Sequence, residues 1–207
     1  PKKMVLRDKI FNPFQKPDMG GKPYCVIVCD NATLERMIGL EYYQNATVSI
    51  VVDHHASNEG YGDVNWTEVS EACAENVYHM LDPQCLRKAA EAEEHPTAAD
   101  YIYLGIAHDT GGMARAKKST LLALVDLMSM GVDHGEIMKT MHSDTLDTLN
   151  KRADIIRSAR RAMEGKVAYV IMDAREHTEK KIIYEDIHCV STILRDCDDI
   201  ELGFTMY

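Results

Sequence analysis

The sequence predicts an α/β fold, in which a parallel β-sheet with flanking helices is followed by a long helix and the start of a second, smaller α/β domain. The first observation is a pair of short, strand-length runs of apolar residues that end in polar ones, "YCVIVCD" (24–30) and "VSIVVDHH" (48–55). The second is the helical segment between them, because two strands joined by a helix form a parallel β-α-β unit, usually right-handed. The third is the return of the same alternation after residue 165.

The first domain begins with a loop, because residues 1–23 are rich in proline and contain a Gly-Gly pair. Residues 24–30 form a continuous apolar run, which predicts a strand buried on both faces. "NATLERMIGL" (31–40) predicts a helix, with Asn31 or Thr33 available as its cap. Residues 48–55 repeat the scheme with a β-branched strand.

The middle of the chain is predicted to be helical. "AADYIYLGIAHDT" (98–110) breaks at Gly111-Gly112, "TLLALVDLMSM" (120–130) is stopped by Gly131, and "SDTLDTLNKRADIIRSARRAMEG" (143–165) suits one long helix capped by Ser143. The helix predicted at "TEVSEACAENVYHML" (67–81) carries an apolar face made of Val69, Ala72, Cys73, Val77 and Met80 or Leu81.

After residue 165, "KVAYVIMD" predicts a strand, "YEDIHCVSTILRDC" an amphipathic helix and "IELGFTMY" a second strand. Composition adds further limits. The chain is 45% hydrophobic and 27% charged, with no apolar run of membrane-spanning length and no signal-peptide core, so we expect a cytoplasmic protein. Its six cysteines lack zinc-site spacing and are expected to be free thiols. A net charge of −10 argues against a broad basic surface for long duplex nucleic acid.

Carboxylates and imidazoles follow the predicted elements at three points. Asp30 ends the first strand, the Asp53-His54-His55 triplet follows the second, and Asp109 lies in the polar group after an apolar segment. Ligands gather at the carboxyl ends of parallel strands, so we expect these groups to converge. Asp30 alone also suits a helix cap and Asp109 a turn, whereas burial of the whole triplet is costly without metal or pairing. Carboxylate with imidazole favours Mn²⁺, Mg²⁺, Fe²⁺ or Zn²⁺.

These motifs resemble those of the DHH-family phosphoesterases. The Asp53-His54-His55 triplet, preceded by "CVIVCDNATLERM" and followed by "YLGIAHDTGGMARA", is most similar to the subgroup of nano-RNases (oligoribonucleases) and pAp phosphatases. The likeness continues into "VSTILRDCDDIELGFTMY", which resembles the start of a DHHA1 substrate-binding domain. The resemblance implies a DHH domain at 1–142 (incomplete at its N-terminus), a connector helix at 143–164 and a partial DHHA1-like domain at 165–207.

The resemblance also implies a role for each residue. Asp30 matches a carboxylate that bridges two manganese ions, with Mg²⁺ as an alternative, and His54 and Asp109 match ligands of one ion. His55 matches a contact to the substrate phosphate, and Asp53 matches a carboxylate that orients an imidazole. A metal-bound hydroxide would attack phosphorus.

The implied activity is hydrolysis of phosphate esters in short oligonucleotides or nucleotide phosphates. Arg115 is a candidate substrate contact, although a solvated loop charge explains it equally well. The resemblance allows a homodimer and implies neither a membrane nor long duplex nucleic acid as partner. The alternatives are a pyrophosphatase or single-strand exonuclease of the same superfamily, or a non-catalytic nucleotide-binding relative.

The sequence departs from the family pattern at both of its ends. Nothing in residues 1–23 matches the His-x-x-x-Asp-x-Asp motif, and the chain ends at Tyr207 before the Arg-Ser and Gly-Gly-Gly-His signatures. We therefore expect this chain to be catalytically weak or inactive by itself, as an incomplete piece of a phosphoesterase or a degenerate relative.

Overall fold

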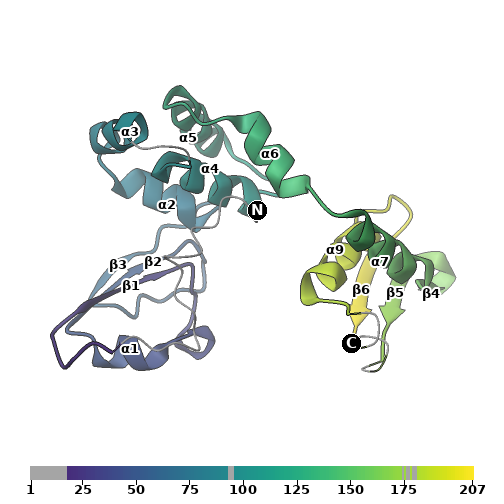
Figure 1. The fold of residues 1–207 in the computed structure, drawn as a ribbon. Helices are drawn as coiled ribbons and strands as arrows, with labels where there is room; N and C mark the ends of the chain where they lie inside the picture. The colour runs from purple at the N-terminus through teal and green to yellow at the C-terminus, as the bar shows by residue number, and fades with distance from the viewer. Residues whose placement is uncertain (1–17, 93–95, 174, 176–177, 179–180) are drawn as a thin grey trace. The chain divides into compact units, whose positions relative to one another are not determined.

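The computed structural model describes residues 18–92, 96–173, 175, 178 and 181–207. The chain divides between His142 and Ser143 into two compact units (Figure 1). Each unit contains a β-sheet with helices, so the predicted α/β class is confirmed. Most of the predicted loop at 1–23 lies outside the described residues, and residues 18–24 have no helix or strand.

The sheet of the first unit has the parallel order β1-β2-β3. Its register pairs Cys29 with Val52 and Val52 with Trp66, so all three strands end at one edge. Burial of β1 on both faces was a wrong prediction: Ile27 is 62% exposed, because among the described residues β1 has a partner strand on one side only. The third strand was not predicted, because it is short and lies in a polar context. The strands are β1 (Cys25–Cys29), β2 (Val48–Val52) and β3 (Val64–Trp66).

The helix predicted at 31–40 is wrong in extent. The chain instead forms a 3-10 turn, η1 (Leu34–Arg36), and then α1 (Leu40–Asn45). Gly39 separates them, since its φ of +82° is left-handed and cannot continue a right-handed helix. Thr33 precedes η1 but its side chain makes no capping bond. Asn31 also caps no helix; its amide donates to the Thr33 carbonyl and the Tyr61 hydroxyl.

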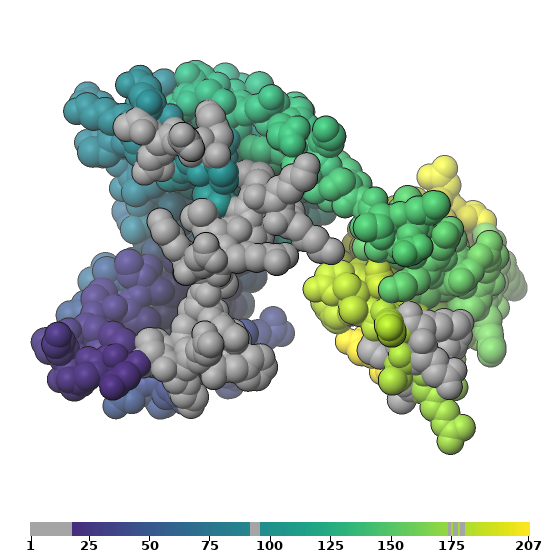
Figure 2. All heavy atoms as spheres, in the orientation of Figure 1, coloured from purple at the N-terminus to yellow at the C-terminus, as the bar shows by residue number. Residues whose placement is uncertain are grey.

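The remaining helices of the first unit pack around one apolar core (Figure 1). Tyr103, Ile106 and Leu127 are almost fully buried in it. In the space-filling view these helices form a continuous mass in blue-green and green (Figure 2). The helix predicted at 67–81 starts at Cys73, so Val69 precedes it and is exposed; Met80 and Leu81, at its C-terminal end, are exposed as well. The helices are α2 (Cys73–Met80), α3 (Pro83–Ala92), α4 (Ala98–Asp109), α5 (Lys118–Ser129) and α6 (His134–His142), of which α3 and α6 were not predicted.

The second unit begins with α7 (Leu146–Arg157), which is shorter than the helix predicted at 143–165. Thr145, not Ser143, caps it, by accepting a bond of 3.1 Å from the Thr148 amide. The rest of the predicted helix forms a strand and a 3-10 turn, since the strand pairs with β5 along its length. These elements and the three predicted ones that follow are β4 (Arg160–Ala162), η2 (Met163–Gly165), β5 (Val167–Ile171), α9 (Tyr184–Arg195) and β6 (Leu202–Met206).

The sheet of the second unit has the order β4-β5-β6, with β4 antiparallel and β6 parallel to β5. One face packs against α7 and α9, where Val170 and Val190 are buried. Gly203 faces α9 so closely that a Cβ atom there would lie 2.5 Å from the Arg195 backbone nitrogen.

Two further predictions concern composition. All six cysteines are free thiols, as predicted, although Cys25 and Cys29 are exposed rather than buried. Within the described parts of the chain, no helix has both the length and the hydrophobicity needed to cross a bilayer.

Candidate metal centre

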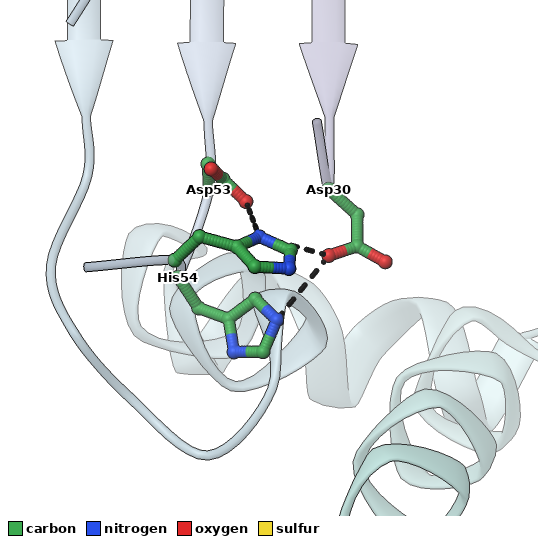
Figure 3. A group of neighbouring side chains, drawn as sticks. Asp30, Asp53 and His54 are labelled. Atoms are coloured by element: carbon green, nitrogen blue, oxygen red, sulfur yellow. Dashed lines mark hydrogen bonds and ion pairs between the residues drawn. The ribbon is translucent and has the colours of Figure 1, made fainter. Parts of the chain in front are cut away.

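The candidate site lies at the edge where β1 and β2 end. The Asp30 amide donates to the Val52 carbonyl (3.0 Å) and the Asp53 amide to the Trp66 carbonyl (3.0 Å), so the backbone pairing extends one residue beyond each strand. This extension sets the two carboxylates on neighbouring strands (Figure 3). Asp30 has a φ of +57°, a left-handed conformation that few residues other than glycine adopt. Ligand atoms of Asp30 and the Asp53-His54-His55 triplet all lie within 4.8 Å of one another.

His54 has the geometry of a metal ligand. Its Nδ1 lies 3.2 Å from the Ser70 carbonyl, which can only accept, so Nδ1 carries the proton and Nε2 has a free lone pair. Nε2 lies 3.3 Å from Asp30 Oδ1 (Figure 3). Two ligand atoms at right angles around an ion, with bonds of about 2.1 Å, lie about 3.0 Å apart. The pair therefore fits one divalent cation with little movement.

Asp53 is suited to orient His55 rather than to bind metal. Its side chain is fully buried; Oδ1 accepts from His55 Nδ1 (2.8 Å) and Oδ2 from Asn58 Nδ2 (2.7 Å). Burial by itself raises the pKa of Asp53, but the bonds from His55, Asn58 and the His54 amide outweigh it and hold this pKa below its usual range. Asp53 is therefore a carboxylate whose oxygens are both occupied, and the His55 ring is fixed with Nε2 directed elsewhere.

Asp109 and Arg115 lie apart from this cluster. Asp109 ends helix α4 rather than a strand, and its carboxylate is 3.6 Å from His108 Nδ1. The Arg115 guanidinium donates to the Asp109 carbonyl and so caps α4. Gly111 allows this approach, because a Cβ atom there would lie 2.9 Å from the guanidinium.

A cavity of about 510 Å³ joins Asp109 to the cluster. Asp30 and Asp109 both line it, although Asp109 is not among the residues whose ligand atoms cluster. Tyr101 lines the cavity too, and its buried hydroxyl is the side-chain polar atom that lacks a hydrogen-bond partner among the described residues. The full lining is Cys29, Asp30, Cys73, Ala74, Val77, Tyr101, Ile102, Leu104, Gly105, His108 and Asp109.

Several residues that shape the site were not identified from the sequence. Asn76 is buried in α2, where it donates to the Asp53 carbonyl (2.8 Å) and the Glu68 carbonyl (2.7 Å). Asn76 lies on the apolar face of the predicted helix, and this unusual position was the signal that could have identified it. For Asn58 the signal was its place in the polar loop directly after the triplet. Cys73 is not among the clustered ligand atoms; burial raises the pKa of its thiol to about 12, and the thiol donates to the Val52 carbonyl.

Comparison with known proteins supports the resemblance seen in the sequence. The chain is 26% identical over 154 residues to the bifunctional oligoribonuclease and PAP phosphatase NrnA of Bacillus subtilis, covering 70% of this chain and 46% of that protein. It is 28% identical over 135 residues to a probable NrnA of Streptococcus mutans, covering 62% and 41%. The chain thus spans less than half the length of these relatives, and no family model matches it.

A solved structure shares the fold. An exopolyphosphatase-related protein from Bacteroides fragilis superposes with a TM-score of 0.70 at 17% identity, covering 85% of this chain and 52% of that one. The predicted resemblance to DHH-type phosphoesterases is therefore confirmed by the NrnA relatives, and the structural neighbour supports the fold.

Proposed function

We propose that this chain carries the catalytic site of a metal-dependent DHH-family phosphoesterase that hydrolyses short oligonucleotides or nucleotide phosphates. The observation that carries the proposal is the cluster of carboxylates and imidazoles at the ends of two neighbouring strands. The names of the NrnA relatives, oligoribonuclease and PAP phosphatase, support this substrate class.

Asp30 and His54 would hold a divalent cation, for which Mn²⁺ and Mg²⁺ suit the oxygen and imidazole donors. Asp109 would contribute from across the cavity, and Asp30, with two oxygens, would bridge to a second ion. When bound, such cations lower the pKa of a water molecule and polarise the phosphate ester. The chain itself supplies the donors, a fixed His54 tautomer and an edge-of-sheet position open to substrate.

His55 would bind the phosphate. Its Nδ1 is held by Asp53, so Nε2 is left to meet a phosphate oxygen, to which it would donate when both ring nitrogens carry a proton. In the hydrolysis, a bond forms between the water oxygen and phosphorus, the ester P–O bond breaks, and the leaving oxygen takes up a proton. Asp53 therefore acts through His55 rather than on the substrate.

The cavity beside Asp30 would take the rest of the substrate. Its volume of about 510 Å³ is in the usual range for a small-molecule site, and most of its lining is apolar. A nucleoside presents a planar apolar ring with polar edges. The unpartnered Tyr101 hydroxyl would give such an edge one hydrogen bond.

The test combines metal binding with turnover on the full chain. Calorimetry with Mn²⁺ is expected to show binding that His54→Ala removes. A 5′-phosphorylated dinucleotide and pAp are then incubated with Mn²⁺, and slow release of mononucleotide or phosphate is expected, absent with EDTA and in His54→Ala. His79→Ala is the matched control, because His79 lies on α2 outside the cluster and is half exposed.

The outcomes separate the alternatives. Release from pyrophosphate or from long single strands in preference to dinucleotides would favour the other activities of the superfamily. Mn²⁺ binding with no turnover on any substrate would favour a non-catalytic relative. Turnover that survives both His54→Ala and Asp109→Ala would contradict the proposed site.

A further inference from the structure

The loop after the Asp-His-His triplet reaches back across the sheet to the residue that follows Asp30. Asn31 accepts two hydrogen bonds at its backbone carbonyl, one from the Tyr61 hydroxyl (2.6 Å) and one from Asn58 Nδ2 (3.3 Å). The Asn31 side-chain amide donates in turn to the Tyr61 hydroxyl oxygen at 2.9 Å. Asn31 and Tyr61 are thus joined by two bonds, and the chain just after Asp30 is fixed by residues 27 and 30 positions further on.

Asn58 links both halves of the candidate metal centre through one nitrogen. Nδ2 carries two hydrogens, and it donates to Asp53 Oδ2 at 2.7 Å as well as to the Asn31 carbonyl. The Asn58 side-chain oxygen accepts from the Gly60 amide (2.8 Å), so the amide group cannot be turned over without losing these bonds. Asn58 therefore ties the end of β1 to the end of β2.

Tyr61 is itself held in place. The Tyr43 hydroxyl donates to the Tyr61 carbonyl, and the two rings meet edge to face with centroids 5.7 Å apart. Burial raises the pKa of Tyr61, so its hydroxyl keeps the proton that it donates. The ring is half-buried, and its hydroxyl meets both the carbonyl and the side-chain amide of Asn31.

These hydrogen bonds from Asn58 and Tyr61 matter because Asp30 has a left-handed backbone. A φ of +57° is less favourable for an aspartate than a right-handed or extended backbone, and it persists where surrounding bonds enforce it. In the relaxed conformation the carboxylate would point elsewhere, and the 3.3 Å approach of Asp30 Oδ1 to His54 Nε2 would be lost. A divalent cation would then meet one ligand instead of two.

We propose that Asn58 and Tyr61 are positioning residues that hold Asp30 in register with the Asp-His-His triplet and so preform the cation site. The role rests on the proposed function, because it presumes that Asp30 and His54 bind a cation together. Neither residue touches the cation; each acts through the backbone that carries Asp30.

Tyr61→Phe is the sharpest test, because it removes one oxygen and leaves the ring packing against Tyr43. Its matched control is Tyr24→Phe, since the Tyr24 hydroxyl also donates to a backbone carbonyl, that of Tyr42 at 2.8 Å, away from the cluster. Calorimetry on the full chain is expected to show Mn²⁺ affinity about tenfold weaker in Tyr61→Phe, at the lower end of effects for groups that orient metal ligands. Tyr24→Phe is expected to bind like the wild type, and both variants are expected to unfold at similar urea concentrations.

A second measurement needs no metal. The imidazole Cε1–H resonance of His54, assigned from His54→Ala, is expected to shift in metal-free Tyr61→Phe and Asn58→Ala, because the facing carboxylate moves, and to stay unchanged in Tyr24→Phe. If the His54 resonance is unshifted in both Tyr61→Phe and Asn58→Ala, the positioning role is overturned, regardless of the Mn²⁺ affinity of these variants. If the wild type binds no Mn²⁺, the proposed function fails, and the positioning role is decided by this resonance alone. Equal Mn²⁺ affinity in Tyr61→Phe and Tyr24→Phe would also overturn it.

Discussion

Replacing the buried carboxylate of Asp53 by an amide tests whether this residue orients His55. In the wild type one carboxylate oxygen accepts from His55 Nδ1 and the other from Asn58 Nδ2, and the His54 amide adds a third bond. Asparagine has one oxygen, so its NH₂ group faces either the Asn58 NH₂ group, which is also a donor, or His55 Nδ1, which can accept from it only after the ring changes tautomer. One bond to a charged acceptor is lost within a fully buried site, which costs about 2–3 kcal/mol of unfolding free energy.

The same substitution changes the response to acid. The pKa of Asp53 is lower in the folded than in the unfolded chain, so its stabilising effect is complete above the unfolded pKa of about 4 and is lost as pH falls through the folded pKa. Asp53→Asn cannot take up this proton. The stability of the variant is therefore expected to fall less steeply than that of the wild type below about pH 4.

The stability of the variant can be followed through the fluorescence of the one tryptophan in the chain. The Trp66 carbonyl accepts from the Asp53 amide, so urea unfolding followed by Trp66 fluorescence monitors the relevant sheet. Mn²⁺ affinity is measured in parallel and is expected to fall about 10- to 100-fold. Asp63→Asn is the control, because Asp63 also accepts two bonds, from Ser49, but lies exposed at the opposite end of β2.

The prediction for stability and the prediction for Mn²⁺ affinity can fail independently of each other. An Asp53→Asn variant as stable as the wild type would refute the argument from burial and bonding. A variant that is destabilised but binds Mn²⁺ with unchanged affinity would refute the orienting role and leave Asp53 with a structural one.

The remaining predictions test the cavity, the two cores and one thiol. Tyr101→Phe removes a hydroxyl without a described partner, so the unfolding free energy should not fall, while a nucleotide titration should show weaker binding; unchanged affinity would argue against the cavity as a nucleoside site. Leu127→Ala should cost about 2–5 kcal/mol in urea unfolding, because the side chain is fully buried, and a cost below about 1 kcal/mol would contradict the core described above. Gly203→Ala should speed hydrogen exchange of the β5 and β6 amides, because the new Cβ would overlap the Arg195 backbone, and unchanged exchange would show that α9 can move aside. Cys73 should resist iodoacetamide at about pH 8, when exposed cysteines are already modified, because its pKa of about 12 leaves little thiolate; early labelling found by mass spectrometry would contradict its burial.

The strands that carry the site were predictable because their signal is local. The β-branched runs at 24–30 and 48–55 match β1 and β2, and the polar residues after them mark the binding edge. Other elements depend on contacts that the sequence does not display. β4 lies in a segment of good helix formers and is a strand because it pairs with β5. Gly39 interrupted a helix that its neighbours favoured, through its left-handed backbone.

Part of the site could be predicted for the same reason. Asp30 and the triplet converge because parallel strands present their carboxyl ends together. Asp109 shows the limit: it comes from a helix, and its distance from the cluster depends on how α4 packs, which no local pattern encodes. Asn58 and Tyr61 act through long-range bonds to Asn31, and polar loop residues of this kind are common without such a role.

The left-handed backbone at Asp30 limits which amino acids can replace this residue. Glycine adopts such a backbone freely, asparagine and aspartate do so more often than most other residues, and aspartate alone of the three carries an anionic oxygen. A homologue with asparagine or glycine at this position would keep the backbone conformation and lose the negative charge. Homologues that bind a cation at this position and homologues that do not are therefore expected to differ here by Asp against Asn or Gly, with the surrounding strands unaltered.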